Sequence, residues 1–509
     1  MRVGILELLA AAPTTSLTPA VGHYLLTKQY ASIMPQAVSV WCRQLGHQVF
    51  YASYYGHGDP RKLLPDDLDV LFISCYTQAS ALGYALAKLY RREKTLTVIG
   101  GPHASSFPND CLRFFDLVVL QCDKALIGDI LGDAVEPKSI VSSGRALTDL
   151  PSVEERMPEV RASAFSRGRW SYVSTSVPLL ASVGCPYTCG FCTDWNSPYA
   201  LMPLDRLEAD LRYVSQRLPG VKISFHDPNF AVRFDETLDV LERVPRPARS
   251  PYIMESSLSV LRGPRLQRLR DTNCIYVAPG IESWSNYSNK AGVGRKTGSQ
   301  KVELVAEHLG ELHTNVPGIQ ANFIFGVDTD EGDEPVELTK EFMRRTPFAW
   351  PVVNIPVPFG GTPLYDEHLA AGRILRSMPF TFYYFPYLVT TLNHYDPLAY
   401  YHKLNELLTY AATKKMLWQR LRTTPNWALR LLHTVRTRHA WGGIQKSRQI
   451  LEMLSADSQF RAFHEGRSAA LPEFYHQEFE RLLGPYAELL SRADRTPELP
   501  PVAAAPVTA

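Results

Sequence analysis

Two series of short apolar runs, each alternating with longer helical segments, constrain the fold of this chain most strongly. The candidate strands of the first series are Val3–Leu9, His47–Ser53, Val70–Cys75, Thr95–Ile99 and Leu117–Leu120. Nearly continuous apolar strands separated by helices are typical of parallel sheets that are covered on both faces. We therefore expect a doubly wound, Rossmann-like α/β domain over residues 1–140.

The second series begins after a charged, irregular linker over residues 141–172. Its candidate strands are Val177–Val183, Val221–Asp227, Tyr252–Ser256, Cys274–Ala278, Gln320–Phe325 and Val352–Val357. Six strand–helix units predict a partial TIM-type (β/α)6 barrel over residues 173–376, with its chemistry at the C-terminal strand ends. Residues 377–495 are predicted to form a helical cap, and the Pro/Ala-rich residues 496–509 a disordered tail.

Three cysteines lie close together just after the first strand of the second series. Cys185, Cys189 and Cys192 have the spacing C-x3-C-x2-C on one short loop. Three such thiolates can hold three corners of a [4Fe-4S] cube and leave the fourth iron open, which distinguishes a catalytic centre from a structural one. A zinc site with His226 or Cys274 as a further ligand is the alternative, although zinc cysteines usually come as separated pairs.

With Phe191 directly before its third cysteine, this loop closely resembles the signature of the radical S-adenosylmethionine (SAM) enzymes. The resemblance implies that the three cysteines ligate a catalytic [4Fe-4S] cluster and that SAM binds the open iron. It also implies that an electron from a donor such as flavodoxin or ferredoxin cleaves SAM to a 5′-deoxyadenosyl radical.

Residues of the cysteine loop and of the predicted strand ends match positions that contact SAM in that family. The resemblance assigns this role to Phe191, Asp227, Asn229, Glu255, Ser256, Glu282, Asn322 and Phe323. Glu282 belongs to a Gly-Ile-Glu-Ser run similar to one in cobalamin-associated members, and residues 360–364 resemble the motif that closes the barrel. For each residue the ordinary alternative is a structural polar group; either Glu255 or Glu282 could form a salt bridge with Lys290 or Arg295.

The first domain resembles the cobalamin-binding domain that precedes many radical SAM domains, most closely in Gly100-Gly-Pro-His-Ala104. Paired glycines permit close backbone approach to a ligand. The contacts implied for the corrin are Ser74, Tyr76, Thr77, Gly100, Gly101, His103, Cys122 and Asp123. The chain lacks an Asp-x-His-x-x-Gly motif, and Gln121-Cys-Asp-Lys124 replaces the usual Gly-Glu-Gly-Glu. The alternative is a scaffold domain without a cofactor.

The segment between Glu406 and Glu452 contains no acidic residue, although three tryptophans, Trp418, Trp427 and Trp441, occur in it. Its basic residues are Lys414, Lys415, Arg420, Arg422, Arg430, Arg436, Arg438, Lys446 and Arg448. Such a helical run can make peripheral contact with an anionic membrane or hold an acidic substrate. The ordinary interpretation is a solvated helix face whose apolar side packs on the barrel.

The bulk composition excludes several other classes of protein. A formal net charge of +2 over 509 residues argues against a dedicated nucleic-acid binder. No apolar run reaches the length of a membrane span. Eight cysteines, five of them scattered, are typical of a reducing compartment, so we expect a cytoplasmic protein.

The family resemblance implies a cobalamin-dependent radical SAM enzyme that methylates an unactivated carbon of a natural-product or lipid-type substrate. A second interpretation keeps the radical chemistry but replaces methylation by cyclisation, rearrangement or oxidation, with a degenerate cobalamin domain. A third is a redox or iron-sensing binding protein with a structural cluster. No residue selects the substrate.

Overall fold

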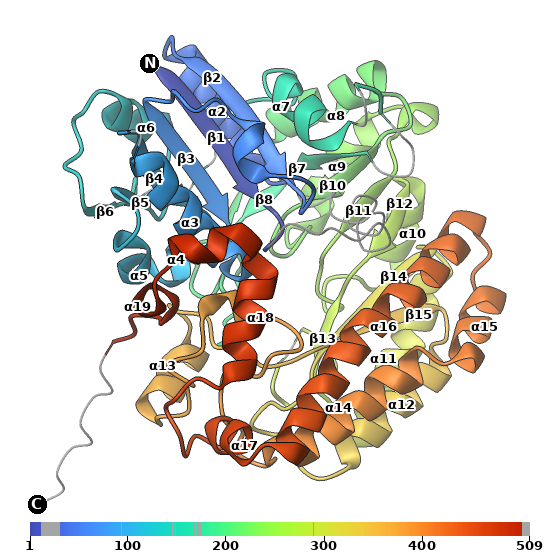
Figure 1. Cartoon of the computed structure of the whole chain (residues 1–509). Helices are drawn as coiled ribbons and strands as arrows, with labels where there is room; N and C mark the ends of the chain where they lie inside the picture. Colours follow the sequence, from blue (N-terminus) through green and yellow to red (C-terminus); the bar gives the residue numbers. More distant parts are fainter. Residues whose placement is uncertain are drawn as a thin grey trace, which may run out of the picture.

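The computed structural model describes residues 1–11, 31–92, 94–144, 147, 149–165, 168–170, 175–288 and 290–500. Several residues of the predicted linker and residues 501–509 of the predicted tail lie outside the described residues. Figure 1 shows two sheets side by side, with the orange and red C-terminal helices lying along the second sheet and returning to the first.

The N-terminal sheet is parallel throughout and has the strand order β2-β1-β3-β4-β5-β6. Its strands are β1 (Arg2–Leu8), β2 (Gln48–Tyr54), β3 (Val70–Cys75), β4 (Leu96–Gly100), β5 (Leu117–Val119) and β6 (Ser139–Val141). The short β6 was not expected, because three residues in a polar context leave no apolar run. Val3 and Ile5 face one apolar cluster, and Leu6 and Leu8 face another, so alternate side chains of β1 fill cores on both faces.

Helices cover both faces of this sheet, as a doubly wound fold requires. Helices α2 (Ile33–Gln44) and α6 (Lys124–Leu131) pack together, with α2 lying against β1. Helices α3 (Ser80–Arg91) and α4 (Pro102–Ser106) contact β3 and β4. The predicted Rossmann-like architecture is therefore confirmed.

The second sheet is also parallel and forms the predicted partial barrel. Its strands are β7 (Ser176–Leu179), β10 (Lys222–Phe225), β11 (Tyr252–Met254), β12 (Cys274–Val277), β13 (Gly280–Glu282), β14 (Gly318–Ile324) and β15 (Ala349–Asn354). Val277 pairs with Ile319 and Gly280 with Asn322, so β12 and β13 continue one another along the same edge of β14. Pro279, which has no amide hydrogen, separates the two halves. Six strand positions result, which confirms the predicted architecture.

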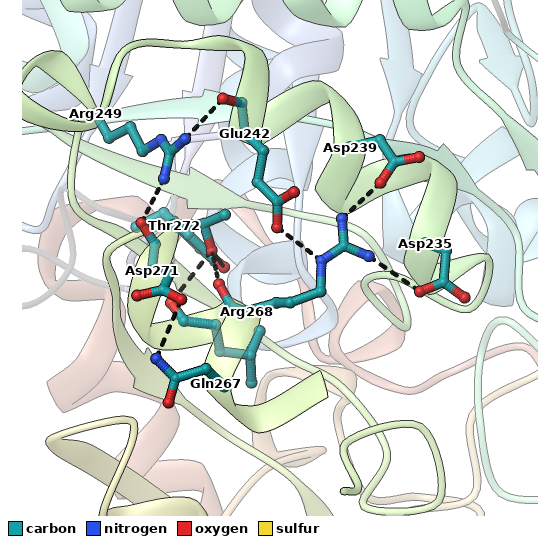
Figure 2. Close-up of polar contacts among 10 residues, drawn as sticks. Asp235, Asp239, Glu242, Arg249, Gln267, Arg268, Asp271 and Thr272 are labelled. Atoms are coloured by element: carbon teal, nitrogen blue, oxygen red, sulfur yellow. Dashed lines mark hydrogen bonds and ion pairs between the residues drawn. The ribbon is translucent and has the colours of Figure 1, made fainter. Parts of the chain in front are cut away.

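Helices surround the outside of the barrel: α8 (Leu204–Arg217), α9 (Phe234–Arg243), α10 (Pro264–Asp271), α11 (Gly298–His313) and α12 (Glu334–Arg345). Figure 2 shows how Arg268 of α10 holds α9. Its guanidinium group donates to Asp235, Asp239 and Glu242 at 3.0, 2.6 and 2.7 Å. These three carboxylates have a structural partner, so their clustering on the outer surface is explained by helix packing.

A buried arginine fixes the two sheets relative to each other. Arg156, which is 2% exposed, precedes helix α7 (Met157–Ala164) between the domains. Its guanidinium group donates to Gln36 Oε1 of α2 at 2.6 Å and to the Pro178 carbonyl of β7 at 3.2 Å. One continuous apolar core also includes residues from both sheets and from the C-terminal helices. The two strand-end regions therefore have a defined mutual position.

The last part of the chain is helical: α14 (Pro397–Ala411), α15 (Lys414–Thr423), α16 (Trp427–Ala456), α17 (Ser458–His464), α18 (Glu473–Leu483) and α19 (Arg492–Arg495). Helix α14 packs on α12, and α16 packs on α14 and α15. The chain then returns to the N-terminal domain, where the Glu498 amide donates to Asp110 at 2.8 Å. Within the part of the chain that the structure describes, no helix is long and apolar enough to cross a membrane.

Candidate functional site

The three cysteines lie in a loop that is closed at its base by a small hairpin. Strand β8 (Ser182–Val183) pairs antiparallel with β9 (Ala200–Leu201), and the loop runs between them. The Cys185 amide also donates to the Ser197 carbonyl at 3.3 Å. Gly184 has φ +68°, and a Cβ there would overlap the Pro198 carbonyl, so the turn into the first cysteine requires glycine.

All three cysteines are free thiols, with Cys185 buried and the other two half-buried. Burial raises the pKa of the Cys189 and Cys192 thiols, and the nearby Lys290 ammonium group acts in the opposite direction. Three sulfur donors beside a half-buried cation suit an anionic iron–sulfur cluster, in which each thiolate binds a different iron. Among the described residues, no group of three or more His, Cys, Asp or Glu side chains is arranged to hold a metal ion.

The cysteine loop is fastened to two other segments of the barrel. Tyr187, between the first two cysteines, shares a hydrogen bond of 2.7 Å with Ser259 and accepts one of 3.3 Å from Ser257. The Ser257 amide in turn donates to Asn229 Oδ1 at 2.9 Å. On another side, the Leu364 amide donates to the Gly190 carbonyl at 2.9 Å. The two attachments restrain the loop from different elements.

Lys290 lies at the centre of the charges around the loop. Its ammonium group is 3.6 Å from Glu282, and it interacts electrostatically with all three thiols. Burial alone would lower the pKa of Lys290, but Glu282 and the thiols raise it above its ordinary value. Burial raises the pKa of Glu282, Glu255 and Asp194, and in each case Lys290 opposes that rise. One cation thus balances several anionic groups.

Phe191, assigned to the SAM site, stacks on an aromatic ring that the sequence pattern did not single out. Its ring centroid is 5.2 Å from that of Tyr287, with an angle of 14° between the planes. Lys290 Nζ lies 5.6 Å from the Phe191 centroid. Tyr287 and Lys290 follow the Gly-Ile-Glu run, in which a Cβ at Gly280 would overlap the Glu282 carboxylate. The glycine therefore makes room for the Glu282 carboxylate beside Lys290.

Two residues assigned to SAM hold the loops around the site. Asp227 is 2% exposed, and its carboxylate accepts hydrogen bonds from the Ala181 amide at 3.0 Å and the Ser182 hydroxyl at 2.6 Å. Burial raises the pKa of Asp227 to about 6, and these hydrogen bonds limit the rise. Ser256, also buried, donates to the Phe230 carbonyl at 2.9 Å. Their contact with SAM stays a prediction, as does that of Asn229.

The remaining residues assigned to SAM differ in their exposure to solvent and in their packing. Glu255 is exposed to solvent. The protein around it still raises the pKa of its carboxyl group, because the charged form is less well solvated there than in water. Asn322 is half-buried and accepts a hydrogen bond of 2.8 Å from Gln320. The Phe323 ring lies between Trp284 and Phe342 of α12. Because neighbouring strand residues face opposite sides, Asn322 points away from the helix-covered face on which Phe323 packs.

At the carboxyl end of the N-terminal sheet, the assigned corrin contacts lie on neighbouring loops. Gly101 has φ +89°, and a Cβ there would lie 2.8 Å from Ser74 Oγ. Tyr76 is 37% exposed, Thr77 begins a short 3-10 helix, and Gly100 is the last residue of β4. Asp123 caps α6 by accepting from the Leu126 amide at 2.9 Å. Cys122 is half-buried, and burial raises its pKa to about 12.

His103 faces the interior of the N-terminal domain. It is fully buried, and its Nε2 is 2.6 Å from the Tyr84 hydroxyl, which donates to Asp110 at 2.7 Å. Burial lowers the pKa of His103 to about 3, so the ring is neutral. Phe107 and Phe380 lie against it. These contacts describe a structural role, and a contact with the corrin stays a prediction.

One short segment contacts both strand-end regions. Leu364 is bonded to Gly190 of the cysteine loop, while Gly360 packs so closely on α4 that a Cβ there would overlap the Ser106 carbonyl. Tyr365 extends this contact, with its ring centroid 5.9 Å from that of Phe107. The segment 360–364 therefore bridges the cysteine loop and the helix that follows Gly100-Gly101.

Sequence reasoning missed several residues in or around the cysteine loop: Tyr187, Asp194, Ser257, Ser259 and Tyr287. Tyr187 and Asp194 belong to the loop itself, and the other three reach it because loops converge at the carboxyl ends of different strands. Tyr187 could have been found from its place between two predicted ligands. For Ser257, Ser259 and Tyr287, no local pattern separates them from ordinary loop residues.

Comparisons with known proteins agree with this geometry. The Radical SAM superfamily matches residues 179–342, which include the cysteine loop and Lys290. Two methyltransferases from Chlorobaculum tepidum are similar in sequence, each 23% identical. The bacteriochlorophyllide d C-12(1)-methyltransferase match spans 60% of this chain and 67% of that protein. The bacteriochlorophyllide d C-8(2)-methyltransferase match spans 72% and 83%.

Two solved structures have the same fold over most of the chain. The radical SAM methyltransferase TsrM from Kitasatospora setae, with cobalamin and a [4Fe-4S] cluster bound, has a TM-score of 0.55 at 12% identity. The match covers 88% of this chain and 99% of TsrM. The cobalamin-dependent SAM radical enzyme OxsB has a TM-score of 0.54 at 13% identity, covering 97% of this chain and 77% of OxsB.

Proposed function

We propose that this chain, a radical SAM enzyme by its residues 179–342, is a cobalamin-dependent methyltransferase acting on an unactivated carbon of a natural-product or lipid-type substrate. The segment 360–364 is the observation that carries the proposal. It joins the cysteine loop to the helix after Gly100-Gly101, so two cofactors held at these places would face a common space. Transfer of a group between two cofactors and one substrate requires such proximity.

The residues of the barrel would bind and orient the first pair of cofactors. Cys185, Cys189 and Cys192 would hold the cluster, and Lys290 would offset part of its negative charge. The carboxylate of Glu255 is suited to the amino group or ribose hydroxyls of SAM. When bound, the cluster and SAM supply radical-initiated removal of a hydrogen atom, and cobalamin supplies the methyl group.

The N-terminal domain would bind cobalamin through backbone groups and mainly uncharged side chains at its strand ends, with Asp123 as the one carboxylate assigned there. Ligands of doubly wound sheets bind at this end, and Gly101 allows close approach of the backbone. The names of the relatives support methylation, because two of them are methyltransferases of bacteriochlorophyllide. They also support a large, mainly apolar substrate for this chain.

The test uses anaerobically purified protein with a reconstituted cluster, incubated with hydroxocobalamin and then desalted. Its visible spectrum is recorded, and 5′-deoxyadenosine and S-adenosylhomocysteine are measured by mass spectrometry in the presence of a reductant. Retained corrin absorbance together with both products is the expected result. A flavodoxin or ferredoxin, the proposed donor class, should replace the chemical reductant.

Other outcomes assign different functions. Retained corrin with 5′-deoxyadenosine but no methylated product would support cyclisation, rearrangement or oxidation. Deoxyadenosine without retained corrin would leave the N-terminal domain as a scaffold. A reconstituted cluster that fails to cleave SAM under strong reduction would favour a redox or iron-sensing protein and overturn the proposal.

A further inference from the structure

Helices α15 and α16 expose an unusual number of large apolar side chains. Trp418, Trp427, Leu431 and Trp441 are 57%, 70%, 53% and 38% exposed. They are four of the twelve large apolar residues exposed in the described part of the chain, yet they fall within 24 consecutive residues. Scattered exposed apolar residues need no explanation, whereas a concentration on neighbouring elements marks an interaction surface.

These side chains alternate with arginines along the outer side of the two helices. On α16, the exposed residues Trp427, Leu431, Arg438, Trp441 and Arg448 follow spacings of four, seven, three and seven. Because 3.6 residues make one turn, such positions share one side of a helix. On α15, Lys414, Trp418 and Arg422 repeat at every fourth residue. We call the exposed residues of both helices the Trp–Arg face.

The structure separates basic residues that serve packing from those that face solvent. Arg420 is fully buried over Trp350, with 4.8 Å between its guanidinium carbon and the ring centroid. Arg436 contacts Tyr276, and Lys446 pairs with Glu478 at 3.1 Å. The exposed basic residues of the two helices are Lys414, Lys415, Arg422, Arg430, Arg438 and Arg448. With no acidic residue between Glu406 and Glu452, the positive charge of this face is not offset from within the segment.

We propose that the Trp–Arg face docks the protein on an anionic phospholipid membrane. Tryptophan is suited to the interface between headgroups and acyl chains, and arginine to phosphate groups. Two of the tryptophans carry an arginine over the ring: Arg422 lies 4.3 Å from the Trp418 centroid and Arg448 5.6 Å from that of Trp441. Each pair thus presents an apolar ring and a phosphate-binding group at one place. Charge complementarity selects anionic over neutral lipid.

One end of this face lies at the opposite end of the barrel from the cysteine loop, which argues against an acidic electron donor as its partner. The Thr423 carbonyl at the end of α15 is 3.4 Å from His313, the last residue of α11 before β14. His313 stacks on Phe348, which directly precedes β15. This end of α15 therefore lies where barrel strands begin, whereas the cysteine loop lies where they end. An electron donor would need to approach the cysteine loop, so we favour the membrane as the partner.

The test is sedimentation of the full-length protein with vesicles of phosphatidylcholine, with and without phosphatidylglycerol, at low and raised salt. We expect binding that needs phosphatidylglycerol and weakens with salt. Replacing three exposed arginines together, Arg422→Gln, Arg438→Gln and Arg448→Gln, should reduce the partition coefficient by at least about tenfold. The pair Trp427→Ser and Leu431→Ser should reduce it by about tenfold as well, through lost apolar insertion.

The matched control is Arg217→Gln with Arg344→Gln, two exposed arginines on α8 and α12, which should bind vesicles as the wild type does. Thermal unfolding of every variant verifies that it is folded. The proposal fails if the wild type shows no preference for anionic vesicles, or if the control reduces binding as much as the Trp–Arg variants. Binding of an acidic flavodoxin that is lost in the arginine variants, without vesicle binding, would assign the face to a protein partner instead.

Discussion

The segment 360–364 connects the regions at the carboxyl ends of the two parallel sheets, but the side chains of these regions differ in kind. At the barrel end, Lys290 lies among three thiols and close to Glu282. At the N-terminal end, the loops present Gly100, Gly101 and the exposed Tyr76. The buried carboxylate there, Glu7, is held by hydroxyl groups and an amide instead of a cation.

This difference indicates what each end can bind. A half-buried ammonium group beside thiols stabilises added negative charge, as a cluster and the carboxylate of SAM would bring. Glycine backbone and an aromatic ring offer shape and apolar area to a large, flat ligand with little net charge. The same sheet architecture thus supports two different binding chemistries, because the loops after the strands carry different residues.

The largest effect should come from the thiols that define the charged end. Replacing Cys185, Cys189 and Cys192 together with alanine should abolish iron binding and SAM cleavage, because no other cysteine belongs to the loop. Iron and sulfide content and 5′-deoxyadenosine formation are the measurements. The control is Cys274→Ala, a buried cysteine at the start of β12, which should retain both. SAM cleavage by the triple variant would refute the cluster assignment.

Removing the cation should be the next largest effect. Lys290→Met leaves the buried Glu282 carboxylate unpaired, which should lower the free energy of unfolding by about 3 kcal/mol. Denaturant unfolding of the cluster-free protein measures it. Adding Glu282→Gln to this variant removes the unpaired charge and should restore most of the stability. If the double variant is no more stable than Lys290→Met alone, the pair is not coupled as the geometry indicates.

For the N-terminal end, two glycines with similar φ provide a test. Gly101→Ala and Gly46→Ala both place a side chain at positive φ, +89° and +87°, where the strain is about 1–3 kcal/mol, and only the Gly101 Cβ also meets a close contact. Only Gly101 lies at the proposed corrin surface, beside Ser74. We expect Gly101→Ala to reduce corrin retention after desalting by about tenfold, whereas Gly46→Ala should reduce stability alone. Equal retention in the two variants would remove Gly101 from the corrin site.

The last effect appears only as the pH changes, and it concerns the buried carboxylates near the two ends, Glu7 and Asp227. Burial raises the pKa of Glu7 to about 7 and that of Asp227 to about 6. Because the folded protein then binds these protons more tightly than the unfolded chain, the free energy of unfolding should fall as pH rises through these windows. The slope is about 1.4 kcal/mol per pH unit for each group while it titrates.

Urea unfolding between about pH 5 and about pH 8 measures this dependence. Glu7→Gln should remove the part that extends to about pH 7, whereas Asp227→Asn should affect only the range below about pH 6. Both substitutions can keep the local hydrogen bonds. The amide NH2 group can donate to the serine hydroxyl that donates to the carboxylate in the wild type, because a hydroxyl oxygen can also accept. An unchanged pH dependence in both variants would contradict the raised pKa values.

Much of this architecture could be predicted because its signals are local. The strands of both sheets were predicted from apolar runs, apart from β6 and the β13 half-strand, which are too short to produce one. The cysteine loop was recognised because all three ligands lie within eight residues. Lys290 was considered only as an ordinary ion-pair partner, since its distance from the loop along the chain conceals its place among the thiols.

The sequence by itself determined the two parallel sheets, the cysteine loop and the basic, tryptophan-containing C-terminal segment. Periodicity and spacing encode such features within a few turns of chain. Only the tertiary structure decided which basic residues face solvent, that His103 turns inward to Tyr84, and that Gly360 and Leu364 join the two strand ends. These outcomes depend on contacts between residues far apart in the chain, where burial and charge are set by neighbours that no local pattern specifies.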